Sequence, residues 1–232
     1  MTEAAVMDFQ KENKLVVDGI VGQKTWRTLL SEEPENPVEL KSRFLSEADL
    51  SNVAKDLGVE LAVIKAVNEV ESSGQGFSGD KPKILFEGHV FWRQLKKHDL
   101  DPNTLTEGNE NILYSRWTRE HYFGGEREHD RLEMAKKIHE NAALESASWG
   151  LFQIMGYHWE NLGYKNVKDF VRLMHKSEGQ HIKAFGRFIL ANNLTKYLKN
   201  KDWAGFARRY NGPGYKTNKY DEKLARAYNK YK

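Results

Sequence analysis

A carboxyl group, Glu71, closes the segment Val67–Gly74, in which an apolar helical pattern gives way to serine and glycine. At the C-terminal end of a helix, unpaired carbonyl groups disfavour the charged form of a carboxyl and raise its pKa, and apolar neighbours do the same. A carboxyl that stays protonated near neutral pH can protonate a glycosidic oxygen. Glu71 is therefore a candidate general acid. The alternative is a surface carboxylate that only ends a helix.

Two later segments add polar groups of the kind that bind sugars. In Ala147–Gly156, Gln153 lies in an apolar setting and must find hydrogen-bond partners if it is buried. A sugar N-acetyl group could supply them, and so could the backbone of a turn. In Arg209–Tyr215, Tyr210 and Asn211 lead into a glycine and proline turn. Each segment alone is weak evidence, so we infer a function only from the three in combination.

A second carboxylate would decide the type of reaction. An inverting glycosidase needs a base that activates water, with the two carboxyls roughly 6.5 to 9.5 Å apart. Glu87 is our first candidate because it follows a predicted short strand and has His89 close by in the sequence. Glu69 is rejected, because two positions before Glu71 on a helix it should point to another face. The alternative for Glu87 is a salt-bridged structural carboxylate.

Helical periodicity dominates the chain from Phe44 onward. Residues Ser46–Asp49 resemble a capping box that opens a helix, and Gly58 suits the left-handed position that stops it. A second helix from Leu61 should end near residues 72–74. Residues 83–90 show the short alternation of a strand or extended segment. The same helical pattern predicts further helices over residues 130–143, 167–175, 178–191, 202–210 and 220–231. The fold class is therefore mainly α with one small β element.

The beginning of the chain has a different character. Residues 1–30 predict a helix, a glycine-containing turn and a second helix that begins near Thr25. Residues 31–39 contain two prolines and four glutamates with little apolar content, which is typical of a solvated linker. We therefore expect a small segment over 1–30, a linker over 31–43 and the main domain over 44–232.

Composition excludes several classes of function. The 232 residues suffice for one domain with a small appendage, and 39% hydrophobic residues exclude a disordered chain. The absence of cysteine excludes disulfide scaffolds, thiol nucleophiles and cysteine-ligated zinc. The eight histidines show no metal-ligand spacing, so we expect surface histidines, no metal and no cofactor. A net charge of +3 falls short of the basic footprint of a nucleic-acid binder.

The sequence shows neither a membrane-spanning segment nor a signal peptide. No apolar run approaches the roughly 20 residues that a membrane span needs. The first residues lack the basic flank and apolar centre of a signal peptide. We therefore expect no membrane insertion and no secretion signal.

Three tryptophans, Trp149, Trp159 and Trp203, could stack on sugar rings. Aromatic residues at helical spacing lie more often in a core, and Trp203 shares a stripe with Phe206 and Tyr210. We favour the core for Trp203 and leave both interpretations open for the other two.

Taken in order, these segments resemble the lysozyme superfamily that includes goose-type lysozymes and soluble lytic transglycosylases. That superfamily carries a Glu-Ser helix end, a Gly-Leu-x-Gln-Ile segment and a Tyr-Asn segment. The resemblance is closer to the N-acetylmuramidase domain of modular phage endolysins, over residues 71–77, 82–91, 146–156 and 203–215. It covers about residues 44–231. It implies a lysozyme-like fold that hydrolyses the β-1,4 bond between N-acetylmuramic acid and N-acetylglucosamine.

Carried over to this sequence, the resemblance implies that Glu71 is the general acid. We expect Glu87 to assist the water, and the sugar to be bound by four residues, Ser72, Gln153, Tyr210 and Asn211. The expected partner is bacterial peptidoglycan, and the chain is expected to act as a monomer. Endolysins of this kind accumulate in the host cytoplasm and then reach the peptidoglycan layer. Two alternatives stay open: a lytic transglycosylase that leaves 1,6-anhydro ends, and a catalytically inactive wall-binding protein.

Residues 4–30 separately resemble the second half of a three-helix peptidoglycan-binding domain. The similarity rests on Ala5–Gln10, Val17–Trp26 and Leu29. The first helix of that family, and the first of its two glycine turns, have no counterpart in this sequence. Wall binding by the segment is therefore left open.

Overall fold

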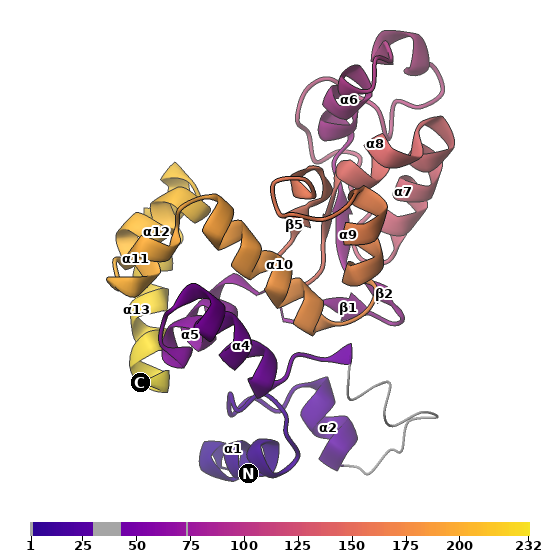
Figure 1. Cartoon of the computed structure of the whole chain (residues 1–232). Helices are drawn as coiled ribbons and strands as arrows, with labels where there is room; N and C mark the ends of the chain where they lie inside the picture. Colours follow the sequence, from indigo (N-terminus) through magenta and orange to yellow (C-terminus); the bar gives the residue numbers. More distant parts are fainter. Residues whose placement is uncertain (1, 30–42, 73) are drawn as a thin grey trace. The chain divides into compact units, whose positions relative to one another are not determined.

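The computed structural model describes residues 2–29, 43–72 and 74–232. The chain forms two compact units, one made of Met1–Glu71 and Ser177–Lys232 and the other of Ser72–Lys176 (Figure 1). The predicted catalytic domain over 44–232 therefore contributes to both units. Nearly all of the predicted linker over 31–43 lies outside the described residues, so the boundary placed there stays a prediction.

The first unit begins with two short helices, α1 (Glu3–Glu12) and α2 (Gln23–Leu29). The side chain of Gln10, which is 2% exposed, organises the turn between them. Its Oε1 accepts the backbone N–H groups of Asp18 and Gly19 at 3.1 and 2.9 Å, and its Nε2 donates to the Thr25 hydroxyl at 3.2 Å. The predicted helix, turn and helix are confirmed.

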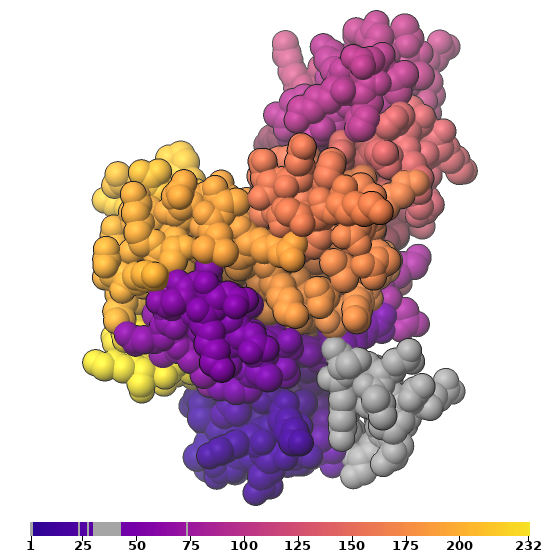
Figure 2. All heavy atoms as spheres, viewed as in Figure 1, coloured from indigo at the N-terminus to yellow at the C-terminus, as the bar shows by residue number. Residues whose placement is uncertain are grey.

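An ion pair joins these two helices to the rest of the first unit. Lys24 Nζ lies 2.8 Å from the Oε2 of Glu178, whose side chain is 2% exposed, and the backbone N–H of Leu45 donates to the same oxygen at 2.8 Å. In the turn between α1 and α2, the carbonyl of Asp18 accepts a hydrogen bond from Lys230 Nζ at 3.1 Å. Figure 2 shows the N-terminal residues lying directly against the neighbouring helices of this unit.

Next come two helices joined at Gly58, α4 (Glu47–Leu57) and α5 (Leu61–Glu71). The predicted capping box is confirmed, because Ser46 and Asp49 exchange side-chain to backbone hydrogen bonds. Gly58 takes the left-handed conformation, with a φ of +61°. Because α5 ends at Glu71, this carboxyl lies at a helix end, as predicted.

The C-terminal part of the first unit is also helical. It consists of α10 (Glu178–Ala191), α11 (Thr195–Lys199), α12 (Trp203–Tyr210) and α13 (Tyr220–Tyr231), with a 3-10 turn over Pro213–Lys216. Helix α13 packs along α5 and on α12, and α10 packs on α4. The predictions for α10, α12 and α13 are confirmed, whereas α11 was not predicted.

The second unit contains two small antiparallel sheets. One pairs β1 (Phe77–Ser78) with β2 (Lys81–Pro82). The other has the order β3 (Ile84–Phe86), β4 (Ala147–Trp149) and β5 (Ile154–Met155), with Ile84 opposite Trp149. The mainly α fold with a small β element is confirmed.

Four helices surround the three-stranded sheet of the second unit (Figure 1). They are α6 (Gly88–Lys97), α7 (Arg127–Ile138), α8 (Glu140–Glu145) and α9 (Val167–Met174), with 3-10 turns at Pro102–Leu105 and Gly156–His158. Helix α9 was predicted. None of the helices in the described ranges is long and apolar enough to cross a membrane.

Two predictions for this unit were wrong in their boundaries. The extended segment over 83–90 ends at Phe86, because Gly88 already begins α6. The single helix over 130–143 is two helices, because His139 leaves the helical conformation with a φ of −158°. The imidazole of His139 then accepts the backbone N–H of Ala142 at 3.1 Å, which caps α8.

Buried imidazole side chains correct one further expectation, and a buried indole decides between two interpretations that the sequence left open. His129 and His181 are 7% and 1% exposed, so they are not surface histidines. Trp149 is 1% exposed and its indole N–H donates to the carbonyl of Leu144 at 3.1 Å, which leaves no ring face for a sugar. The indole N–H of Trp159 donates to Glu145 at 2.9 Å.

Replacing Gly88 by alanine tests the close junction between β3 and α6. A Cβ at this position would lie 2.4 Å from Tyr114 Cε1 and 2.7 Å from the backbone carbonyl oxygen of Ile112. We expect Gly88→Ala to lower the free energy of unfolding by about 1–3 kcal/mol, as overpacking does, in urea unfolding followed by circular dichroism. The control is Gly22→Ala, where a Cβ meets nothing within 4 Å. Equal stability of the two variants would contradict the tight junction.

Candidate active site

Glu71 lies where three helices of the first unit meet. Asn211, at the C-terminal end of α12, donates from Nδ2 to Glu71 Oε2 at 2.8 Å. Burial raises the pKa of Glu71 from 4.5 to about 7, while the bond from Asn211 and the charge of Lys223 on α13 act in the opposite direction. The sequence-based expectation of a raised pKa is therefore confirmed, with burial as the largest cause.

Tyr210 forms an aromatic wall beside this carboxyl. Its ring stacks on Phe206, with centroids 5.5 Å apart, and meets Phe185 edge to face at 5.6 Å. Burial raises the pKa of the Tyr210 hydroxyl, and the negative charge of Glu71 contributes to this shift. Glu71, Tyr210 and Asn211 are thus brought together from two distant segments, because α12 and α5 both pack on α13.

Gln153 lies in the hairpin between β4 and β5, with a φ of +50°. Its Oε1 accepts the hydroxyl of Ser148 at 2.7 Å, and its Nε2 donates to the carbonyls of Gly150 and Lys83 at 2.8 and 3.4 Å. The amide is therefore used within the hairpin. This geometry favours the interpretation in which a turn supplies its partners.

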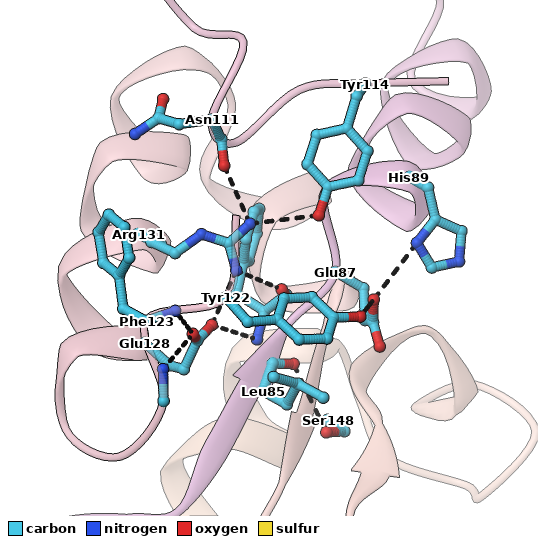
Figure 3. A network of polar contacts seen from close by, with 12 residues as sticks. Leu85, Glu87, His89, Asn111, Tyr114, Tyr122, Phe123, Glu128, Arg131 and Ser148 are labelled. Carbon is cyan, nitrogen blue, oxygen red and sulfur yellow. Dashed lines mark hydrogen bonds and ion pairs between the residues drawn. The ribbon is translucent and has the colours of Figure 1, made fainter. Parts of the chain in front are cut away.

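Glu87 lies between β3 and α6 in the second unit, and its side chain is 15% exposed. The hydroxyl of Tyr122 donates to its Oε2 at 2.5 Å, and His89 Nδ1 lies 3.3 Å from the same oxygen (Figure 3). Burial lowers the pKa of His89, with the charge of Arg93 acting in the same direction and that of Glu87 opposing it. Burial and the bond to Glu87 raise the pKa of Tyr122. Oε2 of Glu87 is therefore held by the hydroxyl of Tyr122, with the imidazole of His89 nearby.

A fully buried arginine stands behind this carboxylate. Arg131 on α7 donates from Nη1 to the carbonyl of Phe86 and to Glu128 Oε2, each at 2.8 Å, and from Nη2 to the carbonyl of Asn111 at 3.0 Å. The side chains of Arg131 and Glu128 are 0% and 1% exposed. The arginine thereby joins the end of β3 to the segment that precedes Tyr122.

Glu128 also links the end of β3 to the segment that contains Tyr122 (Figure 3). Its Oε1 accepts the backbone N–H groups of Phe123 and Gly124 at 2.7 and 2.9 Å, and its Oε2 accepts that of Phe86 at 3.2 Å. One carboxylate therefore binds the backbone of the residue before Glu87 and of the two residues after Tyr122. These bonds hold the side chains of Glu87 and Tyr122 next to each other.

Tyr122, Glu128 and Arg131 were not singled out from the sequence. A signal for two of them was present, because the apolar stripe of α7 through Leu132 and Ala135 extends back at helical spacing to Arg131 and Glu128. Opposite charges in an apolar stripe indicate a buried pair. Tyr122 has no comparable local pattern.

The six predicted site residues are distributed over both units. Glu71, Tyr210 and Asn211 belong to the first unit, and Ser72, Glu87 and Gln153 belong to the second. Ser72 follows α5 directly and is partly exposed. Over the ranges that the structure describes, no group of three or more side chains is arranged to hold a metal ion.

The raised pKa of Glu71 predicts a pH-dependent cost in stability. A carboxyl with a raised pKa contributes stability that is fully present below pH 4.5 and is lost as the pH rises through about 7. Glu71→Gln removes this loss, so its free energy of unfolding relative to the native chain should increase by about 2 kcal/mol between pH 5 and pH 8. Urea unfolding at both pH values measures the difference. The exposed Glu12→Gln is the control, and a difference that is independent of pH would contradict the prediction.

Comparison with known proteins identifies the family of this chain. The model of the N-acetylmuramidase family matches residues 60–232, and that of the putative peptidoglycan binding domain matches residues 1–29. Among solved structures, the Burkholderia AP3 phage endolysin is similar with a TM-score of 0.90 and 45% identity, over 99% of this chain and 85% of that chain. No match is found among the curated proteins. Because the first model matches most of the chain, the chain belongs to the N-acetylmuramidase family.

Proposed function

We propose that this chain cleaves the β-1,4 bond between N-acetylmuramic acid and N-acetylglucosamine, with Glu71 as the general acid. As a family member the chain is a peptidoglycan hydrolase of the lysozyme type. The observation that carries the assignment of Glu71 is its pKa of about 7, raised by burial. A substantial fraction of a carboxyl with this pKa is protonated at neutral pH, as a general acid requires.

In the first half of the reaction, Glu71 transfers its proton to the glycosidic oxygen as the bond from that oxygen to the anomeric carbon breaks. The N–H of Asn211 orients Oε2 and remains as a donor to the carboxylate that is left. Lys223 on α13 also favours the charged form. After Glu71 loses its proton, Asn211 and Lys223 thus stabilise the negative charge of its carboxylate.

In the second half, Glu87 takes a proton from the attacking water, whose oxygen forms the new bond to the anomeric carbon. Tyr122 and His89 both lie at Oε2, so Oε1 is available to the water. This fixed orientation supports a role as general base for Glu87. If no base acts, attack by a substrate hydroxyl would give a 1,6-anhydro product instead.

Four residues were expected to bind the sugar, and their environments differ. Tyr210 and Asn211 lie beside Glu71, which supports direct contact with the substrate. Ser72 is proposed to bind the sugar because it follows Glu71 directly in the sequence. For Gln153, the hydrogen bonds within its hairpin support an indirect role, in which it holds the hairpin that carries Ser148.

The route to the substrate is also part of the proposal. The likeness to a phage endolysin supports action on the peptidoglycan layer. We propose in addition that the chain accumulates in the host cytoplasm before lysis and acts as a monomer. The match over residues 1–29 supports wall binding by α1 and α2. Ile20 and Trp26, which are 58% and 49% exposed, offer apolar surface for such binding.

Glu71→Gln tests the acid directly. We expect this variant to lose about 100-fold to 10,000-fold in the rate of wall hydrolysis, the usual contribution of a general acid, while Glu12→Gln keeps full activity. Release of reducing ends from purified peptidoglycan, with mass spectrometry of the products, gives the rate and the bond. Retained activity would remove Glu71 from the mechanism. Products with 1,6-anhydro ends would replace the hydrolase by a lytic transglycosylase.

Tyr122→Phe tests whether the orientation of Glu87 matters. Loss of the 2.5 Å hydrogen bond should reduce kcat about 10-fold with little change in KM, as expected when one charged hydrogen bond is lost. The control is Tyr157→Phe, at an exposed tyrosine of the same unit. An unchanged kcat would exclude this role for Tyr122.

A further inference from the structure

Asn68 carries a buried oxygen with no hydrogen-bond partner. It lies on α5 three residues before Glu71, a spacing that places both side chains on one face of the helix. Its Oδ1 is buried and has no donor among the residues that the structure describes. Asparagine is a weak helix former, and a buried acceptor without a donor is unfavourable. Local structure therefore gives no reason for this side chain.

Three more buried acceptors share this property in the first unit, and one of them, Glu47 Oε2, belongs to a carboxylate whose other oxygen pairs with Lys65. Glu71 Oε1 and Asn211 Oδ1 are buried without a donor among the described residues, although Asn211 Nδ2 is bonded to the other oxygen of Glu71. The acid thus has one unmatched oxygen of its own, a second on the bonded Asn211 and a third on Asn68, one helical turn earlier on α5. Such a group is complete only when a ligand brings the donors.

The chemistry of these oxygens restricts the ligand. A carboxylate or phosphate would face three partial negative charges, so an anionic group is disfavoured. The hydroxyl and acetamido N–H groups of an N-acetylated sugar are neutral donors. Carbonyl oxygens also favour the positive charge that develops on the sugar ring in glycoside hydrolysis. The ligand that fits is a neutral amino sugar with its acetamido group intact.

We propose that Asn68 contacts the substrate, with its Oδ1 accepting a hydrogen bond from the acetamido N–H of the sugar next to the scissile bond. The inference rests on the proposed function only for the position of the sugar beside Glu71. Asn68 is then a residue for substrate recognition, which the sequence patterns did not indicate. The oxygen that has no donor in the free protein acquires one when the sugar binds.

Binding of the N-acetylglucosamine hexamer tests this, with calorimetry in a Glu71→Gln background that prevents turnover. We expect Asn68→Ala to weaken binding about 10-fold, the effect of one lost hydrogen bond in a binding site. Asn52→Ala, at an exposed position on neighbouring α4, is the matched control.

Stability separates recognition from a structural role. Asn68→Leu removes the unmatched acceptor, so the ligand-free variant should be at least as stable as its parent while binding the hexamer more weakly. A cellulose oligomer of the same length, which has hydroxyls in place of acetamido groups, should bind the parent and Asn68→Ala equally. Unchanged hexamer binding in Asn68→Ala, or no hexamer binding by the parent, would overturn the inference. Loss of wall hydrolysis in Glu71→Gln would still stand, so the two proposals fail separately.

Discussion

The buried pair of Glu128 and Arg131 is the constraint on which the second unit depends. Two charges withdrawn from water are tolerated only when nearly all of their hydrogen-bonding capacity is used. Here Arg131 and Glu128 bond to each other and to backbone groups of β3 and of the segment before α7, whereas Arg131 Nε has no partner among the described residues. The same bonds that compensate for burial therefore bring distant stretches of chain together. The position of Tyr122 against Glu87 is one result.

The two proposed catalytic carboxyls have opposite surroundings. Burial favours the neutral form of Glu71, and the donor from Asn211 opposes this effect. Glu87 has a hydroxyl donor at Oε2 and an imidazole nitrogen beside it. Environments of different character allow two identical side chains to act as acid and base in one reaction. The family assignment gives the reaction, and these surroundings give each residue its proposed part.

Much of the fold was predictable where a local pattern and the tertiary structure agree. The capping box at Ser46, the stop at Gly58 and the continuous stripes of α10 and α13 needed no distant contact. The break at His139 was missed because a side-chain cap interrupts an apolar stripe that runs on across it. Within the site, Glu71 and Asn211 lie in recognisable segments. Tyr122 could not be found, since its importance arises only when α7 brings it to Glu87.

The ion pair between Lys24 and Glu178 bears on how such proteins can be recombined. Burial lowers the pKa of Lys24, and Glu178 has little access to water at the start of α10. A wall-binding segment exchanged from another protein would bring its own residue to position 24. Unless that residue is basic, Glu178 would lose the cation that lies 2.8 Å from its Oε2. The N-terminal helices are thus not a freely interchangeable attachment, and a productive chimera has to inherit both halves of the pair.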